Sequence, residues 1–253
     1  MLSKAKIKLI RSLENKKDRR ATGLFLAEGG KIIEDMAPYL NCRLLAATEE
    51  WLALHPDIKA GETVAASSGE IERASLMQSP QDVVAVFEMP RHEYSPEKLK
   101  GKLVIALDGV QDPGNLGTIV RTADWFGIDT VLCSAGCADI YNPKSIQASM
   151  GAAARVAVLY GDLQKMIIET GKPVFGTFLD GENIYETELA NDAVIVMGNE
   201  GKGISTKTEA VVTRRITLPS FKGEGQGCVE SLNVAAATAA ICAEFRRRDY
   251  LRQ

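Results

Sequence analysis

Short apolar runs alternate with segments of helical periodicity along the second half of the chain. The apolar runs predict strands at 103–107, 130–133, 156–159, 173–177, 193–197 and 215–218. Helical spacing of apolar residues predicts helices over 115–126 and 231–247. Continuous apolar strands separated by helices are typical of a mostly parallel sheet with helices on both faces. We therefore expect an α/β domain here.

The first half shows a smaller alternation of the same kind. Strands are expected at 24–27, 43–46, 63–65 and 82–87, with helices at 3–13, 31–40, 49–54 and 69–76. A basic loop is expected at 15–20. Prolines and charges interrupt the pattern near residue 95, which is typical of a connecting segment. These features predict a small α/β domain at 1–92, a linker at 93–101 and a larger domain at 102–253.

Composition fits a globular protein, since 45% of the 253 residues are hydrophobic. No apolar run is long enough to cross a bilayer, and the first residues lack the apolar core of a signal peptide, so a soluble cytoplasmic protein is expected.

Five cysteines at irregular spacings favour buried free thiols over a zinc site, and we expect no metal. Because the two histidines, His55 and His92, lie outside the glycine motifs, a Ser-His-Asp or Cys-His site is disfavoured.

Charge is unevenly distributed. The whole chain has a net charge of −3, whereas residues 1–20 carry eight basic and two acidic side chains, a net +6. A segment this basic can bind phosphates of a nucleic acid. It can equally be the solvated face of a helix, and charge alone leaves both interpretations open.

Two segments place asparagines at predicted helix starts. In the first, a turn at 112–114 leads to Asn115, which can cap the following helix, and Arg121 follows within two turns. In the second, Ser231 is a suitable N-cap, and Asn233 would then lie in the first turn. Taken singly, each segment is explained well by capping alone.

A third segment is harder to explain without a ligand. Gly198, Gly201 and Gly203 follow a five-residue apolar strand, with Glu200 between them. Glycine allows close backbone approach and positive φ angles. Because a tight turn seldom needs three glycines, this segment favours a binding function over a plain connection. In open α/β sheets, ligands bind at strand ends and helix N-termini of this kind.

A fourth glycine-rich stretch, 223–227, resembles a dinucleotide-binding loop between a strand and a helix. It would support a small-molecule oxidoreductase that binds NAD. A Rossmann unit needs another strand after the helix, and only a short tail remains here, so we discount this interpretation.

In order and spacing, the three motifs resemble those of the SpoU/TrmH family of RNA ribose 2′-O-methyltransferases, part of the SPOUT superfamily. The resemblance covers roughly 102–247 and rests on Asn115 with Arg121, on 198–201, and on 231–233. More weakly, 25–29 resembles the substrate-binding domain related to ribosomal protein L30e that many members carry.

The resemblance implies a deep C-terminal trefoil knot, a homodimer, and S-adenosylmethionine as cofactor. The implied reaction moves its methyl group to a ribose 2′-hydroxyl of RNA. Structured ribosomal RNA is favoured because the N-terminal domain and the basic segment accompany the catalytic domain. A transfer-RNA methyltransferase and a non-catalytic RNA-binding or assembly module on the same fold remain the alternatives.

Residue roles also follow from the resemblance. It implies substrate-positioning or catalytic roles for Asn115, Arg121, Glu200, Ser231 and Asn233. It implies cofactor contacts for Thr177, Gly198, Leu218 and Leu232. The family's usual proposal makes the arginine a general base, but a guanidinium stays protonated and has no acceptor. A phosphate held by Arg121 could take the proton instead, or Arg121 could stabilise the developing alkoxide.

Overall fold

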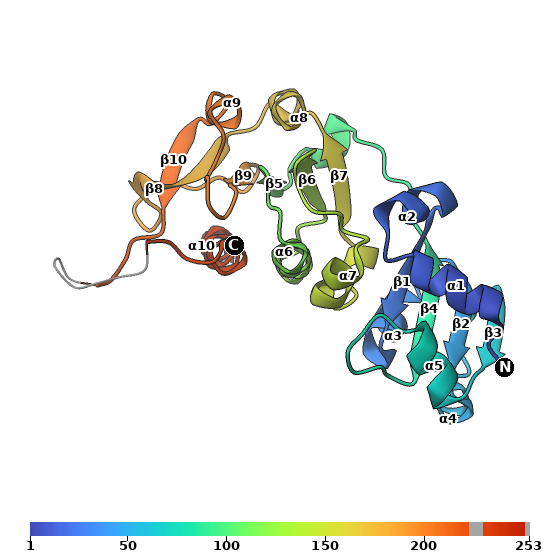
Figure 1. Ribbon diagram of the computed structural model, residues 1–253. Helices are drawn as coiled ribbons and strands as arrows, with labels where there is room; N and C mark the ends of the chain where they lie inside the picture. Colours follow the sequence, from blue (N-terminus) through green and yellow to red (C-terminus); the bar gives the residue numbers. More distant parts are fainter. Residues whose placement is uncertain (223–229, 251–253) are drawn as a thin grey trace. The chain divides into compact units, whose positions relative to one another are not determined.

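The chain divides into two compact units in a computed structural model that describes residues 1–222 and 230–250 (Figure 1). The N-terminal unit consists of Met1–Arg91 with Asp139–Arg155, and the C-terminal unit of His92–Ala138 with Val156–Gln253. The segment 139–155 thus leaves the C-terminal unit and packs with the N-terminal one, which the sequence did not predict. The boundaries 1–92, 93–101 and 102–253 stay a prediction.

The N-terminal unit is built on a four-stranded sheet of order β1-β4-β2-β3. Strand β4 runs antiparallel to β1 and β2, while β2 and β3 are parallel. Its elements are α1 (Lys4–Ser12), α2 (Lys16–Thr22), β1 (Leu24–Glu28), α3 (Gly30–Met36), β2 (Cys42–Ala47), α4 (Glu49–Leu54), β3 (Glu62–Ala65), α5 (Ser68–Ala74), β4 (Val83–Glu88), α7 (Pro143–Ser149) and the 3-10 turn η2 (Ala152–Ala154).

Both faces of this sheet are buried. Helices α1 and α5 pack on one face, where Ile10 and Ile71 meet Leu26 from β1. On the other face, the rings of Phe25 and Phe87 lie 5.9 Å apart between centroids. Alternation along each strand explains the two faces, since neighbouring side chains point to opposite sides.

The basic loop expected at 15–20 is wrong, because Lys16–Thr22 form α2. Asn15 stands at the N-cap in an extended conformation, and Gly23 ends the helix in the left-handed region at φ 68°. Apolar residues at helical spacing could not predict this helix, because the residue that it buries is the cation Arg19, which is 1% exposed.

The C-terminal unit contains a six-stranded sheet of order β10-β8-β9-β5-β6-β7, and all its pairings are parallel. The mostly parallel sheet expected from the apolar runs is therefore confirmed. Its elements are η1 (Pro96–Leu99), β5 (Val104–Leu107), α6 (Pro113–Trp125), β6 (Thr130–Ser134), β7 (Ala157–Gly161), α8 (Leu163–Thr170), β8 (Val174–Asn183), β9 (Val194–Met197), α9 (Thr206–Glu209), β10 (Arg214–Thr217) and α10 (Val234–Tyr250).

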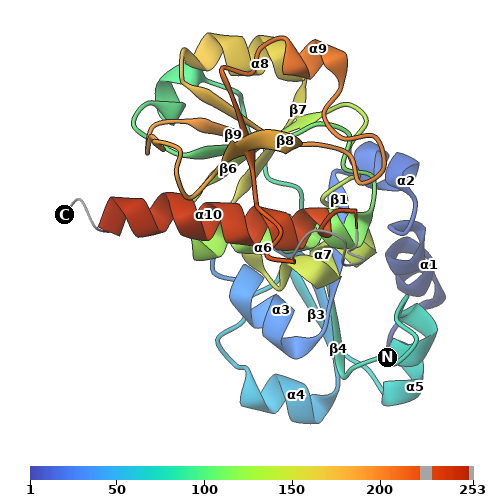
Figure 2. The ribbon, with the colours of Figure 1, turned by 90° about the vertical axis from the view of Figure 1, so that its left-hand side faces the viewer.

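Helices cover both faces of the large sheet. Helices α8 and α9 lie on one side, while α6 and α10 lie side by side on the other (Figures 1 and 2). Met166 and Ile167 of α8 pack on the first face with Val104 and Val196. On the second face, the ring of Phe245 from α10 meets Phe175 edge-on at 5.3 Å. This double coverage explains why the central strands read as unbroken apolar runs.

Within the expected linker, Leu99 is buried, and Tyr94 Oη donates to Met166 O at 2.6 Å. No helix in the described part of the chain is long and apolar enough to span a membrane. The four described cysteines are buried free thiols, as expected. The glycine-rich stretch 223–227 lies outside the described residues.

Candidate active site at the carboxyl ends of the parallel strands

The three motifs follow the carboxyl ends of strands or precede a helix in the C-terminal unit. The first motif follows β5 and leads into α6, the second follows β9, and the third precedes α10. Strands β5 and β9 are parallel neighbours, with Leu107 opposite Met197, so their following loops meet at one edge of the sheet. Topology alone therefore places the first two motifs together.

Side-chain amides and one carboxylate connect all three motifs. Asn115 Nδ2 donates to Glu200 Oε1 at 3.1 Å, and Asn233 Nδ2 donates to Asn115 Oδ1 at 3.0 Å. We call Asn115, Glu200 and Asn233 the amide–carboxylate cluster. Its members lie 85 and 118 residues apart along the chain, so only the fold brings them together.

Asn115 is not the helix cap that the sequence predicted. Asp112 takes that position, and its side chain accepts from Asn115 N at 2.9 Å while Pro113 occupies the first turn. The side chain of Asn115 is therefore free to face Glu200 and Asn233. Capping does not explain this residue.

The prediction for the third motif was also wrong in its register. Asn233, rather than Ser231, caps α10, since Asn233 Oδ1 accepts from Ala235 N at 3.0 Å and from Ala236 N at 3.3 Å. The amide nitrogen of Asn233 remains available for Asn115. Ser231 is exposed, and among the described residues its hydroxyl has no hydrogen-bond partner.

Glu200 is the acceptor on which the first two motifs converge. Besides Asn115, it accepts from Asn199 Nδ2 at 3.2 Å and from the N–H groups of Gln111 and Asp112 at 3.4 Å each. Burial raises the pKa of the Glu200 carboxyl, but hydrogen bonds from Asn115 and the backbone outweigh this effect and leave the pKa below its usual range. Glu200 is therefore a fixed anion near neutral pH and a weak proton acceptor.

Two glycines of the second motif, Gly198 and Gly203, are explained by the loop itself. A Cβ at Gly198 would lie 2.3 Å from the carbonyl carbon of Gly203, and Gly203 has φ 68°. Asn199 N and Gly203 O are bonded at 2.9 Å, as are Gly203 N and Asn199 O. The loop folds back on its own backbone, so Gly198 and Gly203 need no ligand to account for them, whereas this geometry does not require a glycine at Gly201.

Sequence reasoning missed Asn199. Its Nδ2 donates to Gly109 O at 2.7 Å, and its Oδ1 accepts from the N–H groups of Gly201 and Lys202 at 3.0 Å each. It therefore closes the second loop and fastens it to the first. An asparagine directly before Glu200 in a glycine-rich turn was the available signal, because asparagine side chains bond to the backbone two residues on.

The structure does not draw every predicted site residue into the cluster. Arg121 is exposed, and it has no hydrogen-bond or ion-pair partner among residues 1–222 and 230–250. Thr177 Oγ1 donates to Val196 O at 3.0 Å, one strand residue from the second motif. Leu218 directly follows β10 and is half-buried, and Leu232 is 57% exposed beside Asn233. Their roles stay predictions.

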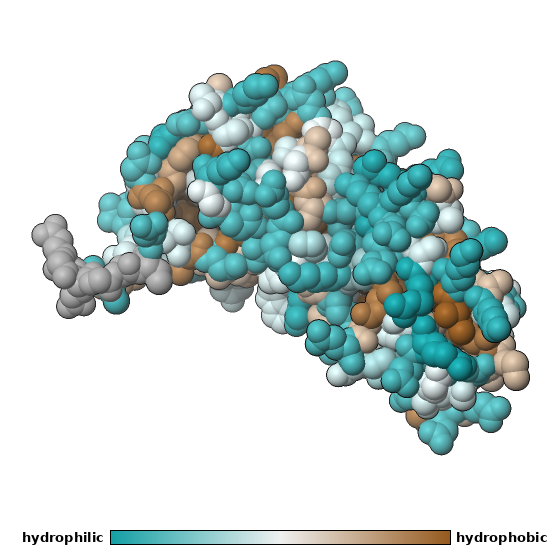
Figure 3. Space-filling view, viewed as in Figure 1, coloured by the Kyte–Doolittle hydropathy of each residue, from teal (hydrophilic) through white to brown (hydrophobic). Residues whose placement is uncertain are grey.

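Apolar side chains are exposed around β8 and the approach to α10. Leu179, Tyr185, Phe221 and Leu232 all lie on the surface, and Figure 3 shows brown surface in this part of the C-terminal unit. In the described part of the chain, no group of His, Cys, Asp and Glu could hold a metal ion.

Comparison with known proteins gives two family matches. Residues 102–243 match the SpoU rRNA methylase family, and residues 4–85 match the MRM3-like substrate-binding domain. These two segments correspond to the two resemblances seen in the sequence.

Individual relatives cover almost the whole chain. The 23S rRNA (guanosine(2553)-2′-O)-methyltransferase RlmP of Bacillus subtilis is 30% identical over 95% of this chain and 96% of its own. A TrmH-family structure from Porphyromonas gingivalis is 42% identical, with a TM-score of 0.87 over 98% of this chain and 99% of that one. An AdoMet-bound rRNA methyltransferase from Sinorhizobium meliloti is 28% identical, with a TM-score of 0.81 over 98% of this chain and 96% of that one. With a family match over more than half of its length, a parallel sheet of the same architecture and three motifs joined at one edge, the chain belongs to the SpoU rRNA methylase family.

Proposed function

We propose that this protein transfers a methyl group from S-adenosylmethionine to a ribose 2′-hydroxyl of ribosomal RNA. The observation that carries the proposal is the amide–carboxylate cluster, which unites the three motifs at one edge of the sheet. Family membership and relatives that act on rRNA or bind AdoMet confirm the enzyme class and cofactor expected from the sequence. A non-catalytic module is not favoured.

The residues at this edge fit a cofactor with an apolar body and a cationic centre. Leu232 and Leu218 offer apolar side chains, and Gly198 offers backbone groups beside Glu200, a fixed anion. Thr177 lies next to the same strand end through its bond to Val196 O. We propose that Thr177, Gly198, Leu218 and Leu232 hold S-adenosylmethionine, whose sulfonium supplies the electrophilic methyl carbon.

The remaining predicted residues would prepare the RNA hydroxyl. We propose that Asn115, Glu200, Ser231 and Asn233 position the ribose, because the cluster fixes its amides relative to each other across three segments. Arg121 is exposed and without a polar partner among the described residues, so it can bind an RNA phosphate or a developing alkoxide. Alignment of the hydroxyl oxygen with the methyl carbon supplies much of the rate acceleration in this scheme.

Labelled methyl transfer tests the reaction. The protein should label a ribosomal RNA fragment and leave a DNA of matching sequence unlabelled, because DNA lacks the 2′-hydroxyl. Equal labelling of both would exclude ribose 2′-O chemistry. Calorimetry with S-adenosylmethionine tests the alternative, since no binding at saturating cofactor would favour a non-catalytic module.

Substitutions test the residue roles. Arg121→Ala and Asn115→Ala should each lose most of the activity while cofactor binding persists. Arg214→Ala is a matched control, since Arg214 is exposed at the opposite end of β10 from Leu218. Near-normal turnover in both site variants would show that the assigned roles are wrong.

The choice of RNA is supported by the substrate-binding domain and by the Bacillus relative. Mapping 2′-O-methyl groups in ribosomal and transfer RNA from cells with and without the gene tests it. A mark that disappears from ribosomal RNA is the expected result. A mark lost only from transfer RNA would favour the transfer-RNA alternative.

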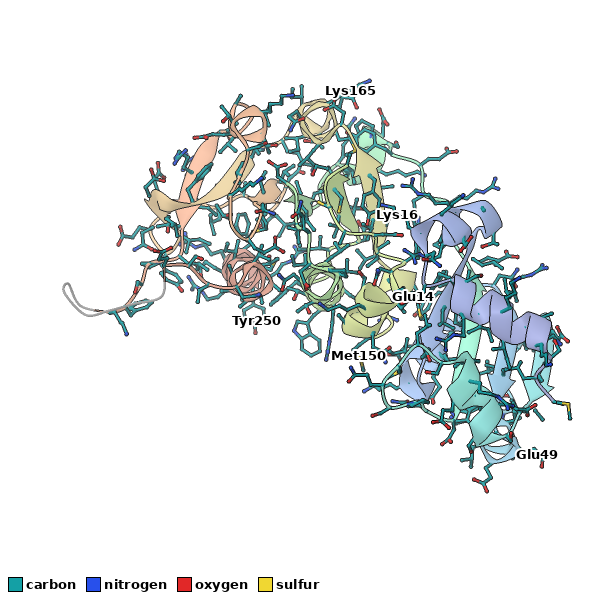
Figure 4. The ribbon with its side chains drawn as sticks, in the orientation of Figure 1. Glu14, Lys16, Glu49, Met150, Lys165 and Tyr250 are labelled. Carbon is teal, nitrogen blue, oxygen red and sulfur yellow. The ribbon has the colours of Figure 1, made fainter. Side chains whose placement is uncertain are left out.

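We further propose that the protein is a cytoplasmic homodimer with a C-terminal trefoil knot. Two aromatic residues support a dimer face on α6 and α10, since Trp125 of α6 is 85% exposed and Tyr250 of α10 is 80% exposed. Tyr250 is labelled at α10 in Figure 4. The knot is supported by the chain path, because β10 lies at the sheet edge whereas α10 returns to α6. Analytical ultracentrifugation should give the mass of two chains, and a single-chain mass at micromolar concentration would refute the dimer.

A further inference from the structure

A cavity of about 330 Å³ lies within the N-terminal unit and contains no residue of the three motifs. It is lined by β1, by the segment that follows α5, and by helix α7, which packs beside β1. All of its lining residues belong to the N-terminal unit, so the cavity is a feature of this unit alone. Small-molecule sites occupy about 300–1,000 Å³, so this volume suits a single ring system and is too small for a duplex.

The walls of the cavity are mostly apolar. Leu26 of β1 lines it together with Leu76 and Met77, and Ile146 of α7 lines it as well. Gln147 Nε2 donates to Met77 Sδ at 3.3 Å, so a hydrogen bond links α7 to the segment after α5. Leu26 and Ile146 are buried parts of the fold, so these walls exist before any ligand binds. Aliphatic walls that include a methionine sulfur favour an aromatic ring.

Glu28, the last residue of β1, is the buried carboxylate of this cavity and is 5% exposed. Ser75 Oγ donates to Glu28 Oε2, and Leu76 N donates to Oε1 at 3.1 Å. The neighbouring cation Arg11 donates instead to the carbonyl oxygens of Arg73 and Ser75, at 3.2 and 3.1 Å. Each carboxylate oxygen has two lone pairs, so each oxygen of Glu28 can accept one further hydrogen bond.

Two adjacent N–H donors on a ligand would match these two open positions. Burial raises the pKa of the Glu28 carboxyl despite its hydrogen bonds, so further donors would stabilise its ionised form. Guanine presents two such donors, N1–H and N2–H, on its Watson–Crick edge. Adenine and cytosine place an acceptor nitrogen beside their amino group, and uracil places its one N–H between two carbonyls. Only guanine can therefore donate to both oxygens at once.

The surroundings of the cavity favour RNA over a free nucleotide. Glu14 lines the cavity and stands two residues before Lys16, the first residue of α2, and both are labelled in Figure 4. Lys16, Lys17 and Arg20 of this helix are exposed, and exposed cations can bind the phosphates of an RNA strand. Sequence-specific recognition of RNA takes unstacked bases from single-stranded segments. The same unit carries the match to a substrate-binding domain.

We propose that this cavity binds one unpaired guanine of the substrate RNA, other than the nucleotide that is methylated. Glu28 accepts from N1–H and N2–H, while Met77 and Ile146 enclose the ring. The inference rests on the proposed function, because it takes RNA as the ligand. The cavity selects the RNA, whereas the methyl transfer belongs to the C-terminal unit.

Short single-stranded RNAs test the choice of guanine with the full-length protein. One strand is an oligouridylate with a central guanosine, and the other carries inosine, which lacks the N2 amino group, at the same place. The inosine strand should bind the wild type about tenfold more weakly, because a hydrogen bond to a charged group is lost. The methyl NMR signal of Met77 should shift with the guanosine strand. Equal affinity for the two strands, or an equal shift with uridine alone, would overturn the inference.

Variants test the residues. Glu28→Gln can still accept from Leu76 N and donate to Ser75 Oγ, but it lacks the second acceptor, so its affinities for the two strands should agree within about twofold. Met77→Trp fills the cavity from another position and should lose the same preference. Glu72→Gln is the matched control, because Glu72 is exposed on α5 and does not line the cavity. An unchanged preference in both cavity variants would contradict the assignment.

Binding and methyl transfer distinguish this inference from the proposed function. If the wild type methylates ribosomal RNA but does not prefer the guanosine strand, the cavity assignment fails and the proposed function stands. If the wild type prefers the guanosine strand but methylates no RNA, the proposed function fails and the cavity assignment stands.

Discussion

Glu200→Gln is the sharpest test of the amide–carboxylate cluster. Each oxygen of Glu200 accepts two hydrogen bonds: Oε1 from Asn115 Nδ2 and Asp112 N, and Oε2 from Asn199 Nδ2 and Gln111 N. Glutamine keeps one oxygen and replaces the other by an NH₂ group. Whichever way the new amide rotates, two donors face another donor.

The expected loss follows from these two bonds. The Glu200 side chain is exposed and two of its bonds are 3.4 Å long, so each lost bond is taken at about 1 kcal/mol, below the usual range for a charged acceptor. Two such losses total about 2 kcal/mol, or roughly a 30-fold drop in kcat/KM if the cluster positions the substrate in the transition state.

Single-turnover methyl transfer to ribosomal RNA measures this effect, with Glu188→Gln as the control. Glu188 is exposed in the same unit and has no polar partner in the described part of the chain, so its variant makes the same charge change without touching the cluster. A wild-type kcat/KM in Glu200→Gln would show that the cluster does not position the substrate.

The lowered pKa of Glu200 adds a second expectation. The stabilisation that the ionised Glu200 carboxylate gives the fold is complete above its ordinary pKa of 4.5 and is lost only as pH falls below that value. The pH–rate profile should therefore show no limb from Glu200 near neutral pH.

Three further predictions concern single residues. Asn233→Asp keeps a capping oxygen but loses the donor to Asn115, so turnover should fall with little change in melting temperature, whereas Asn233→Ala should also lower that temperature by about 2–4 °C in thermal denaturation. Phe245→Ala opens a cavity against Phe175 and should lower the free energy of unfolding by about 3–5 kcal/mol in urea titrations. Burial raises the pKa of Glu28 and outweighs its hydrogen bonds, so its contribution to stability is greatest below pH 4.5 and is lost as pH rises through the raised pKa. Glu28→Gln should flatten the stability curve just above pH 4.5, and an unchanged curve would contradict this assignment.

The parallel sheet could be predicted because its central strands are buried on both faces. All residues of β5 and β9 are buried, and such strands need continuous apolar sequences. The sequence also suggested that the three motifs form a single site, but it did not give the order of the strands. That the first two motifs meet at one edge follows from the pairing of β5 with β9, which the structure shows.

Contacts over long sequence separations could not be predicted. Arg19 and Asp139 are 120 residues apart, and a buried cation breaks the apolar pattern by which helix α2 would be recognised. The segment 139–155 reads as part of the C-terminal domain along the chain, although it packs with the N-terminal unit. Local patterns report which face of an element is buried and do not report what buries it.

Helix caps were misassigned because several suitable residues stand close together. Asp112 and Asn115 are both good caps, and the choice falls on the residue whose backbone is extended, which is Asp112 at ψ 122°. Pro113 favours this choice because it is tolerated in the first turn and its fixed φ suits the helix start. The proline could have decided the cap from sequence, and would have left Asn115 without a structural explanation.

Structural and functional explanations for an asparagine are not exclusive, and Asn233 shows why. Its oxygen caps α10, and its nitrogen donates to Asn115, so one side chain fixes the helix and extends the cluster. Aspartate would cap this helix as well, with a favourable charge at the helix N-terminus. Only the amide offers an acceptor and a donor at once. Capping of α10 needs only the side-chain oxygen of Asn233. Helix stability does not require the hydrogen bond from its nitrogen to Asn115, so this bond is physical evidence for a site.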